Sequence, residues 1–498
     1  MPQMSIIIAL CLYVLLTLLV GIYAGRKVKD SADFVVAGRR LGIWLATGTL
    51  AATWFGTGTV LGAAGAAYEG GFLAVIADPF GAALCLFLAG LFYVRIMRRM
   101  GISTIAEFFE RRFGKTAGVV AAACTIPAYV GWVASLMVGF GKIIHGLTGL
   151  DPIIGTCLGA AIVLIYTTAG GMWAVTLTDF IQVTVLTIGL IFMTPILLND
   201  MGGWAAIRAQ IPDDQFYLYP RDADMTTWFN YARAWLVIGL GNLAGQDLLQ
   251  RSLSSRDESV AQNSAYLSGI IYLTVGLLPV FLGIAATLTF PNLADPEQVM
   301  VKLAETYLPP LGMAVFIGAL ISALMSSADS ALLAPASVIG NDLVRYLRPD
   351  IDALSQLRIC RLSVPILGII ALYLALTNNS VYTLMIDSWS ILLATLFVPL
   401  TAGIWWSKAN RLGALWAMIS GAIAWLILLQ VAPDQPADLL AVPIGLIFLI
   451  IVSTTTAQTD PPRPLSTSDG TPLPFADRLG ILNPRHNLSN KQTHASQS

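Results

Sequence analysis

Charged side chains are scarce in this sequence. Asp, Glu, Lys and Arg make up 11% of its 498 residues, against about 25% in ordinary soluble domains. The net charge is −1, so the chain lacks the basic excess that nucleic-acid binding requires. Hydrophobic residues make up 56% of the chain. This balance excludes a soluble globular protein and predicts an all-α integral membrane protein.

Histidine and cysteine are also rare. Two of the three histidines, His486 and His494, lie in the C-terminal tail, which argues against a histidine proton relay. The five cysteines are scattered singly, so neither a zinc site nor a disulfide framework is indicated. No nucleophile–base pair, metal cluster or phosphate-binding loop is recognisable, and we therefore expect no enzymatic activity.

Long apolar runs dominate the sequence. A bilayer core requires about 20 mostly apolar residues per helix, and thirteen stretches meet this length: 5–25, 44–68, 72–97, 117–146, 152–170, 174–198, 228–249, 262–288, 310–339, 358–377, 381–406, 411–431 and 438–456. Residues 1–456 are thus expected to form one transmembrane domain. The segment 457–498 is rich in Pro, Ser, Thr and Asn and is expected to be a disordered cytoplasmic tail.

The distribution of positive charge supports this number of spans. With the N-terminus outside, 23 of the 28 Lys and Arg residues fall on the cytoplasmic side, as the positive-inside rule requires. No positive residue precedes the first apolar run, which distinguishes it from a signal peptide. We therefore expect a multi-pass protein of the cell inner (plasma) membrane, with a cytoplasmic C-terminus.

One span carries polar groups at its centre. An Asp near the middle of a membrane helix costs about 2.5 to 3.5 kcal/mol, yet the ninth span contains Met325-Ser326-Ser327-Ala328-Asp329-Ser330. Clustered oxygens with no Lys or Arg nearby suit a small hard cation. This pattern indicates ion transport.

Two further spans contain glycine-rich interruptions, at 53–59 and 238–247. An unwound helix frees carbonyl groups, which is tolerable in a membrane only where a cavity or ligand uses them. Close helix packing through small residues is the alternative explanation. The two interruptions lie five spans apart and so have opposite topology, which is typical of the central site of an inverted-repeat transporter.

Several motifs, taken together in order, resemble the sodium:solute symporter family over residues 1 to about 456. They are Gly170-Gly171-Met172-Trp173-Ala174-Val175 with Thr178, Asp179 and Gln182; Gly245-Gln246-Asp247 with Gln250 and Arg251; Met325 to Ser330, up to Asp342; and Phe397-Val398-Pro399-Leu400. The resemblance implies a leucine-transporter-like 5+5 inverted repeat, with its core about 44–198 and 228–406. It also implies alternating access driven by a sodium gradient.

The same resemblance implies a sodium site. Its ligands would be the carbonyl groups of Ala52, Phe55 and Ala323 and the hydroxyls of Ser326 and Ser327. Hydroxyls that bond back to their own helix are the alternative for the two serines. Asp179 would lie on the sodium exit path and help to coordinate a second ion, unless it is a water-exposed helix-end carboxylate. Asp329 is either an acid that interacts with the residues that bind the ion or a hydrogen-bond acceptor inside the helix bundle.

Within the family, the resemblance is to the high-affinity choline transporter branch, through Ala52-Thr53-Trp54 and Met325 to Ser330. An aromatic box holds choline in that branch. Trp54 and Trp132 match two of its walls, whereas the position of a third wall is Gly245 here. Membrane-interface packing is the alternative for each tryptophan.

Four other residues are candidates for solute binding. Thr57 lies in the first interruption, Asn242 and Gln246 lie in the second, and Asp78 lies beside Pro79 within the third span. A structural hydrogen bond is an equal alternative for Asp78. The spans hold almost no cations, so aromatic faces would suit a cationic solute, whereas a carboxylate would depend on helix N-termini, neutral donors or sodium.

The sequence therefore predicts a sodium-coupled symporter that imports a small polar organic solute, either choline-like (quaternary ammonium) or amino-acid-like. A sodium-independent uniporter or channel, or a symporter for a carboxylate or sugar, is the alternative. The expected partners are the solute, Na⁺ and the lipid bilayer, and not nucleic acid.

Overall fold

The computed structural model describes residues 31–56, 58–221, 223–378 and 380–473, together with Leu15, Leu19, Val20 and Tyr23. These residues are almost entirely helical, with isolated β-bridges in place of a sheet. The all-α expectation is met. Most of the expected first span, 5–25, lies outside the described residues, as does Thr57.

Among the described residues, eight helical segments are long and apolar enough to cross a membrane. A ninth span results if Gly58–Ala74 and Ile76–Phe92, which meet at a bend of 79°, are taken as one. Of the thirteen expected spans, 5–25 lies mostly outside the described residues, and 152–170 contains only the shorter apolar segment Pro152–Ile165. The expected spans 44–68 and 228–249 are interrupted by non-helical residues, so no continuous helix that the structure describes in them reaches the length of a membrane span.

The long helix α9 (Pro152–Asp200) covers two of the expected spans, 152–170 and 174–198. A break between these two spans was expected, but the chain is helical throughout. Only Val175–Asp200 is long enough to span a membrane, and Pro152–Ile165 is a shorter apolar segment. The two parts contact different helices: Gly155 lies against Gly141 of α8 (Lys115–Thr148), and Phe180 lies against Gly48 of α3 (Ile43–Trp54).

Both glycine-rich interruptions are present. Helix α3 ends at Trp54, and the next residue, Phe55, has a non-helical ψ of 64°. The chain continues through Gly56 into η2 (Gly58–Ala63) and α4 (Ala64–Ala74). Helix α11 (Met225–Gly241) is followed by η5 (Asn242–Ala244), by Gly245 with an extended backbone, and by α12 (Gln246–Leu253).

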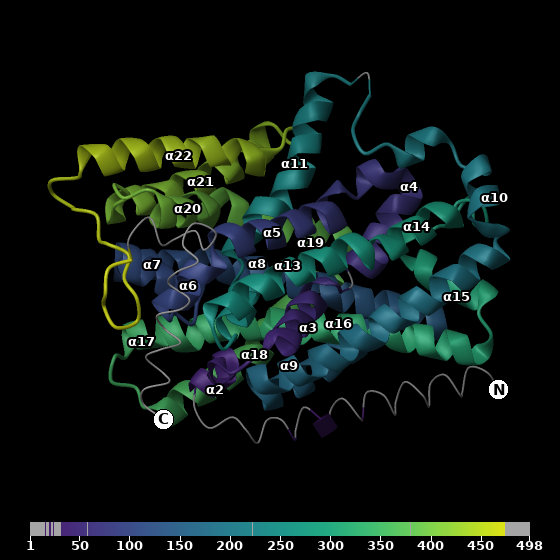
Figure 1. Cartoon of the computed structure of the whole chain (residues 1–498), viewed down its shortest axis with the longest axis horizontal. Helices are drawn as coiled ribbons and strands as arrows, with labels where there is room; N and C mark the ends of the chain where they lie inside the picture. Colours follow the sequence, from purple (N-terminus) through teal and green to yellow (C-terminus); the bar gives the residue numbers. More distant parts are fainter. Residues whose placement is uncertain are drawn as a thin grey trace.

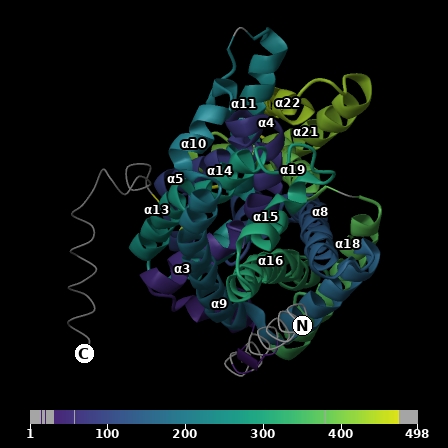
Figure 2. The ribbon, with the colours of Figure 1, turned by 90° about the vertical axis from the view of Figure 1, so that its right-hand side faces the viewer.

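The helices form a bundle, with their long axes mostly along the horizontal direction of Figure 1. Viewed from its end in Figure 2, α8 and α16 (Pro310–Val338) lie near the centre, with α9 and α3 to one side. Helix α19 (Val381–Leu392) packs on α8. The last two helices, α21 (Arg411–Val431) and α22 (Ala437–Thr455), pack against each other at the edge.

Polar side chains cap several of these helices. Asp257 accepts a hydrogen bond from the Val260 N–H at the start of α13 (Glu258–Thr274). Asp352 caps α18 (Ala353–Leu376) through the Ser355 N–H, and Ser380 caps α19. Each cap satisfies one N–H group that a helix start leaves without an internal partner.

The beginning of the C-terminal tail is held by contacts. The Arg112 guanidinium donates to the Arg463 carbonyl, and the Leu473 N–H donates 2.8 Å to the Leu465 carbonyl, closing a turn. Leu465 and Leu473 are buried. A few apolar side chains and an arginine of the bundle thus hold residues 463–473, and residues 474–498 of the expected disordered tail lie outside the described residues.

Candidate functional site

The middle of α16 lies against the unwound end of α3. The Ser326 hydroxyl donates to the Ala52 carbonyl at 2.8 Å and to the Ala323 carbonyl at 3.2 Å. The Ser327 hydroxyl donates to the Thr53 carbonyl at 2.9 Å. Both serines are 1% exposed. Three of the five oxygens expected to bind sodium, those of Ser326, Ala52 and Ala323, are thus connected by hydrogen bonds, and Ser327 and Phe55 lie at the same helix junction.

Glycine is required at the break in α3. A Cβ atom on Gly56 would lie 1.9 Å from the Ser327 hydroxyl oxygen and 3.3 Å from the Ala323 carbonyl oxygen. No side chain fits in that space. The absence of a side chain at Gly56 therefore lets the unwound backbone approach the serine pair.

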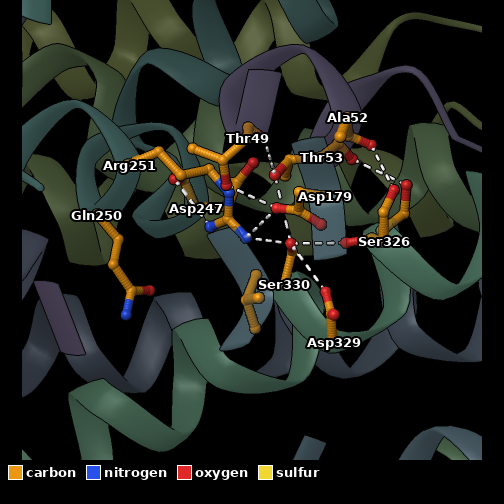
Figure 3. A network of polar contacts seen from close by, with 12 residues as sticks. Thr49, Ala52, Thr53, Asp179, Asp247, Gln250, Arg251, Ser326, Asp329 and Ser330 are labelled. Carbon is orange, nitrogen blue, oxygen red and sulfur yellow. Dashed lines mark hydrogen bonds and ion pairs between the residues drawn. The ribbon is translucent and has the colours of Figure 1, made fainter. Parts of the chain in front are cut away.

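A buried polar network lies next to the serines, as Figure 3 shows. Asp179 on α9 accepts a 2.6 Å hydrogen bond from Thr49 on α3, and its carboxylate lies 4.0 Å from the Arg251 guanidinium. Arg251 also donates to the Ser330 hydroxyl, and Ser330 lies 3.3 Å from the Thr53 hydroxyl. Asp179 is fully buried, so it is not the water-exposed helix-end carboxylate considered from the sequence.

The Asp179 carboxylate retains acceptor capacity. Its second oxygen, Oδ1, has no hydrogen-bond partner among the described residues. This network joins α3, α9, α12 and α16, so the carboxylate can respond to movement of either broken helix.

Four of the six solute-binding candidates line one small central cavity: Trp54, Asp78, Trp132 and Asn242. Its volume is about 20 Å³, which is room for about one water molecule. The other lining residues are Gly56, Gly58, Ala82, Leu136, Ile238, Tyr272, Ser327, Met385 and Trp389. Ser327 thus belongs both to the serine pair and to the cavity wall.

Two polar oxygens of this cavity lack partners. Asp78 is 2% exposed, and its Oδ2 accepts a 2.7 Å hydrogen bond from Thr59. Its Oδ1 has no partner among the described residues, and neither does the side-chain oxygen of Asn242. No Lys or Arg is among the described residues that line the cavity. The cavity therefore offers acceptors and a carboxylate without a neutralising cation.

Aromatic rings form much of the cavity wall. The ring centroids of Trp132 and Trp389 lie 5.0 Å apart, and those of Trp54 and Tyr272 lie 6.4 Å apart at nearly right angles. The Tyr272 hydroxyl donates to the Trp54 carbonyl, which also accepts a 2.8 Å hydrogen bond from the Gly56 N–H at the end of α3. Sequence reasoning did not select Tyr272 or Met385, because each lies in an apolar helix where no local pattern marks it.

Gln246 differs from its predicted role. Its side chain points away from the cavity: Oε1 accepts a 2.7 Å hydrogen bond from the Ile105 N–H, and Nε2 donates to the Ser103 carbonyl at 3.4 Å. The side chain is fully buried. As the first residue of α12, it ties that helix to the start of α7 (Ile105–Phe113).

Two larger cavities involve elements near the central one. The residues that line a cavity of about 640 Å³ include Gly62 on η2, Val138 on α8 and Tyr382 on α19. The same three elements also contribute residues to the central cavity. Ion pairs close part of it, with Lys142 2.8 Å from Asp295 and 2.9 Å from Glu297. A cavity of about 850 Å³ lies at residues that include Ser103, Asp342 and Arg463.

Comparison with known proteins identifies the family. The model of the sodium:solute symporter family matches residues 34–421. The human high affinity choline transporter 1 is 29% identical over 444 residues, covering 83% of this chain and 75% of that protein. The osmoregulated proline transporter OpuE of Bacillus subtilis is 27% identical over 441 residues, covering 85% of this chain and 89% of that protein.

A solved structure shows the same fold. A Na⁺-coupled sialic acid symporter in a substrate-bound outward-open state aligns with a TM-score of 0.79 at 21% identity, covering 93% of this chain and 98% of that one. The chain is thus a multi-pass plasma-membrane transporter and not an enzyme, and the coupling ion is sodium. The protein belongs to the sodium:solute symporter family and is a sodium-coupled symporter of small organic solutes.

Proposed function

We propose that this symporter imports a small organic solute with an ammonium group, either a choline-like quaternary ammonium cation or an amino-acid-like zwitterion. The observation that carries the proposal is the free Oδ1 atom of Asp78, buried in a cavity with aromatic walls and no lining cation among the described residues. A buried carboxylate oxygen without a hydrogen-bond partner or a neighbouring cation is costly. A solute cation would supply the missing charge.

The aromatic walls favour the same class of solute. A desolvated cation over a tryptophan face gains about 2 kcal/mol or more, and Trp54, Trp132 and Trp389 all line the cavity. Quaternary ammonium groups donate no hydrogen bond, so they depend on such faces. The choline and proline transporters among the relatives support an ammonium solute.

The serine pair and the carbonyl groups of Ala52, Phe55 and Ala323 are proposed to bind the sodium ion. The Ser326 and Ser327 hydroxyls donate to carbonyl oxygens in this structure. Rotating each hydroxyl hydrogen away would turn the oxygen lone pairs toward an ion. Five neutral oxygens would replace much of the hydration shell and still allow release. Asp179 is proposed to act on the exit path of the ion.

The topology is part of the proposal. We infer thirteen spans across residues 1–456, with the two halves 44–198 and 228–406 as a 5+5 inverted repeat. The N-terminus lies outside, and the tail 457–498 lies in the cytoplasm. The two interruptions, one in each half, support this arrangement. The central cavity, at about 20 Å³, is too small for an organic solute in this structure. Alternating access then opens it first to one side of the membrane and then to the other.

The test is a binding screen on purified protein, with and without sodium. Thermal unfolding is measured with choline, betaine, proline, other amino acids, small carboxylates and sugars. An ammonium compound is expected to raise the unfolding temperature in sodium. Stabilisation only by a carboxylate or a sugar would replace the proposal with that alternative. Counterflow in liposomes distinguishes a carrier from a channel, which shows no trans-stimulation.

The variant Asp78→Asn then tests whether the Asp78 carboxylate binds the solute. Asparagine keeps an oxygen for the Thr59 hydroxyl but removes the charge. Two opposite charges at a partly solvated site attract each other by about 4 kcal/mol, so we expect the affinity for a cation to fall about tenfold or more. Asp438→Asn is the matched control, because Asp438 is an equally buried acid whose partner is Arg233, at 2.8 Å. An unchanged affinity in Asp78→Asn would exclude the carboxylate from solute binding.

A further inference from the structure

A second buried carboxylate lies behind the cavity wall. Asp247, the second residue of α12, is fully buried, and its two oxygens accept hydrogen bonds from two different helices. Oδ2 accepts from the Trp54 indole N–H at 2.7 Å, and Oδ1 accepts from the Tyr129 hydroxyl. The acid therefore connects α12 to the end of α3 and to the middle of α8.

The Tyr129 contact is reciprocal. The hydroxyl that donates to the carboxylate also accepts a 2.9 Å hydrogen bond from the Asp247 N–H. This N–H lies in the first turn of α12, where it has no partner within its own helix. Tyr129 thus caps α12 and fixes the side chain of Asp247 at the same time.

The backbone beside Asp247 leaves room for this arrangement and for nothing larger. A Cβ atom on Gly245 would lie 1.8 Å from the Asn242 side-chain oxygen and 2.8 Å from Asp247 Oδ1. The space beside the extended residue Gly245 is therefore already filled by two polar side chains. At this break, η5 contributes the Asn242 amide and α12 contributes the Asp247 acid.

The carboxylate reaches the cavity only through the aromatic rings. Asp247 and Tyr129 are not among its lining residues, whereas Trp54, Trp132 and Trp389 are. Tyr129 packs edge-to-face on both Trp132 and Trp389, with centroid distances of 5.8 Å in each case. By binding the Trp54 indole and the Tyr129 hydroxyl, Asp247 connects Trp54 to the ring pair Trp132 and Trp389, and all three of these rings line the cavity.

We propose that Asp247 is a positioning residue that fixes the aromatic walls of the solute site. The proposal rests on the proposed function, since it assigns those walls to an ammonium solute. A carboxylate is suited to the role because it accepts on both oxygens. Asparagine offers one acceptor oxygen and one donor NH2 group, so it cannot accept from both Trp54 and Tyr129. The Tyr129 hydroxyl already accepts from the residue 247 N–H, so its hydrogen is directed at the asparagine oxygen, and the NH2 group then opposes the Trp54 indole N–H.

This reasoning predicts a specific rescue. In Asp247→Asn the Trp54 ring loses its fixed orientation, and affinity for choline falls by about tenfold to a hundredfold, the range for a lost hydrogen bond to a charged group. Adding Tyr129→Phe removes the competing hydroxyl, so the asparagine oxygen becomes free for the Trp54 indole. The double variant is expected to bind choline more tightly than Asp247→Asn alone.

The experiment has two readouts on the full-length protein. One is sodium-dependent binding of radiolabelled choline to wild type, Asp247→Asn, Tyr129→Phe and the double variant. The other requires no solute: the indole N–H resonance of Trp54 in tryptophan labelled with ¹⁵N, assigned with Trp54→Phe. We expect Asp247→Asn to move this resonance and the double variant to return it toward its wild-type position.

Asp342→Asn is the matched control. Asp342, on η7 (Ile339–Leu343), is another carboxylate that accepts a hydroxyl hydrogen bond, from Thr104 at 2.8 Å, and it does not line the central cavity. Asp342→Asn should leave choline binding and the Trp54 resonance unchanged. Thermal stabilisation by sodium, measured for every variant, shows that the variant is folded.

The outcomes separate the two proposals. If wild type binds neither choline nor another ammonium compound, the proposed function fails, and the indole resonance still tests Asp247. If Asp247→Asn leaves the resonance and choline affinity at wild-type values, the positioning role is wrong. A double variant weaker than Asp247→Asn in both readouts also overturns it, because a purely structural acid predicts additive losses.

Discussion

The Ser326 hydroxyl lies 2.8 Å from the Ala52 carbonyl oxygen, although 274 residues separate them in the chain. The contact joins the centre of α16 to the last turn of α3, where the helix unwinds. A sodium ion bound between them would interact with both helices. Ion binding at the proposed site would thus be linked to the position of the broken helix that also carries Trp54.

The first prediction concerns the serine pair. Replacing Ser326 and Ser327 together by alanine removes both hydroxyl oxygens and should abolish sodium-stimulated uptake, with apparent sodium affinity falling by at least about tenfold. Uptake into proteoliposomes across a range of sodium gradients measures this. Ser363→Ala is the control, since its hydroxyl bonds back to the Ile359 carbonyl of its own helix at 2.9 Å. Unchanged sodium-driven uptake in the double variant would remove the proposed site.

The second prediction concerns the Trp54 ring. Trp54→Leu keeps an apolar side chain but removes the π face, so it should weaken choline binding about tenfold or more, given about 2 kcal/mol for a desolvated cation–π contact. Binding of 3,3-dimethylbutan-1-ol, an uncharged analogue of similar shape, should change less.

Trp416→Leu is the control for this comparison, because Trp416 is 48% exposed on α21. Equal losses for the charged and uncharged compounds in Trp54→Leu would show that the ring contributes shape alone.

The third prediction separates turnover from affinity at Asp179. Asp179→Asn keeps an acceptor for Thr49 and removes the charge that lies 4.0 Å from Arg251. We expect slower transport, with solute affinity within about twofold of wild type. A twofold change in affinity corresponds to less than 0.5 kcal/mol. Equilibrium binding and initial uptake rates on the same preparation measure both quantities.

Arg251 complicates the interpretation of this variant. Its guanidinium is fully buried, and a buried charge that loses its partner costs about 3 to 5 kcal/mol. Thermal unfolding is therefore measured in parallel. A large loss of solute affinity in a stably folded Asp179→Asn protein would place the residue in the solute site instead.

The fourth prediction follows from the position of Gln246. Gln246→Leu should leave solute affinity unchanged and lower stability by about 1 to 3 kcal/mol, because the buried Ile105 N–H loses its acceptor. Choline binding and the thermal unfolding temperature measure the two effects. Weaker solute binding at normal stability would restore Gln246 as a ligand.

Local patterns alone were sufficient for some of these residues. The serines at 326 and 327 stand out because hydroxyls and a carboxylate are costly at the middle of an apolar span. The glycines at 56 and 245 stand out because they interrupt apolar helices, and the chain does leave the helix at both places. Trp54 lies inside the first interruption and does line the cavity.

Other residues could not be assigned from their neighbours in sequence. Tyr272 and Met385 lie in apolar helices and reach the cavity only because α13 and α19 pack beside it. Asp247 and Gln246 are adjacent at the start of α12, where successive side chains point about 100° apart. One therefore faces Trp54 and the other faces Ile105.

The sequence alone determined that this protein lies in a membrane, that two spans are broken and which helix carries the clustered hydroxyl and carboxylate oxygens. These are properties of single segments, set by the cost of placing charge and unpaired backbone groups in lipid. Only the tertiary structure decided which oxygens converge, that Asp78 has a free oxygen in an aromatic cavity and that Asp247 holds Trp54 and Tyr129. Hydrogen bonds act over about 3 Å, so they depend on the packing of helices that are distant in the chain.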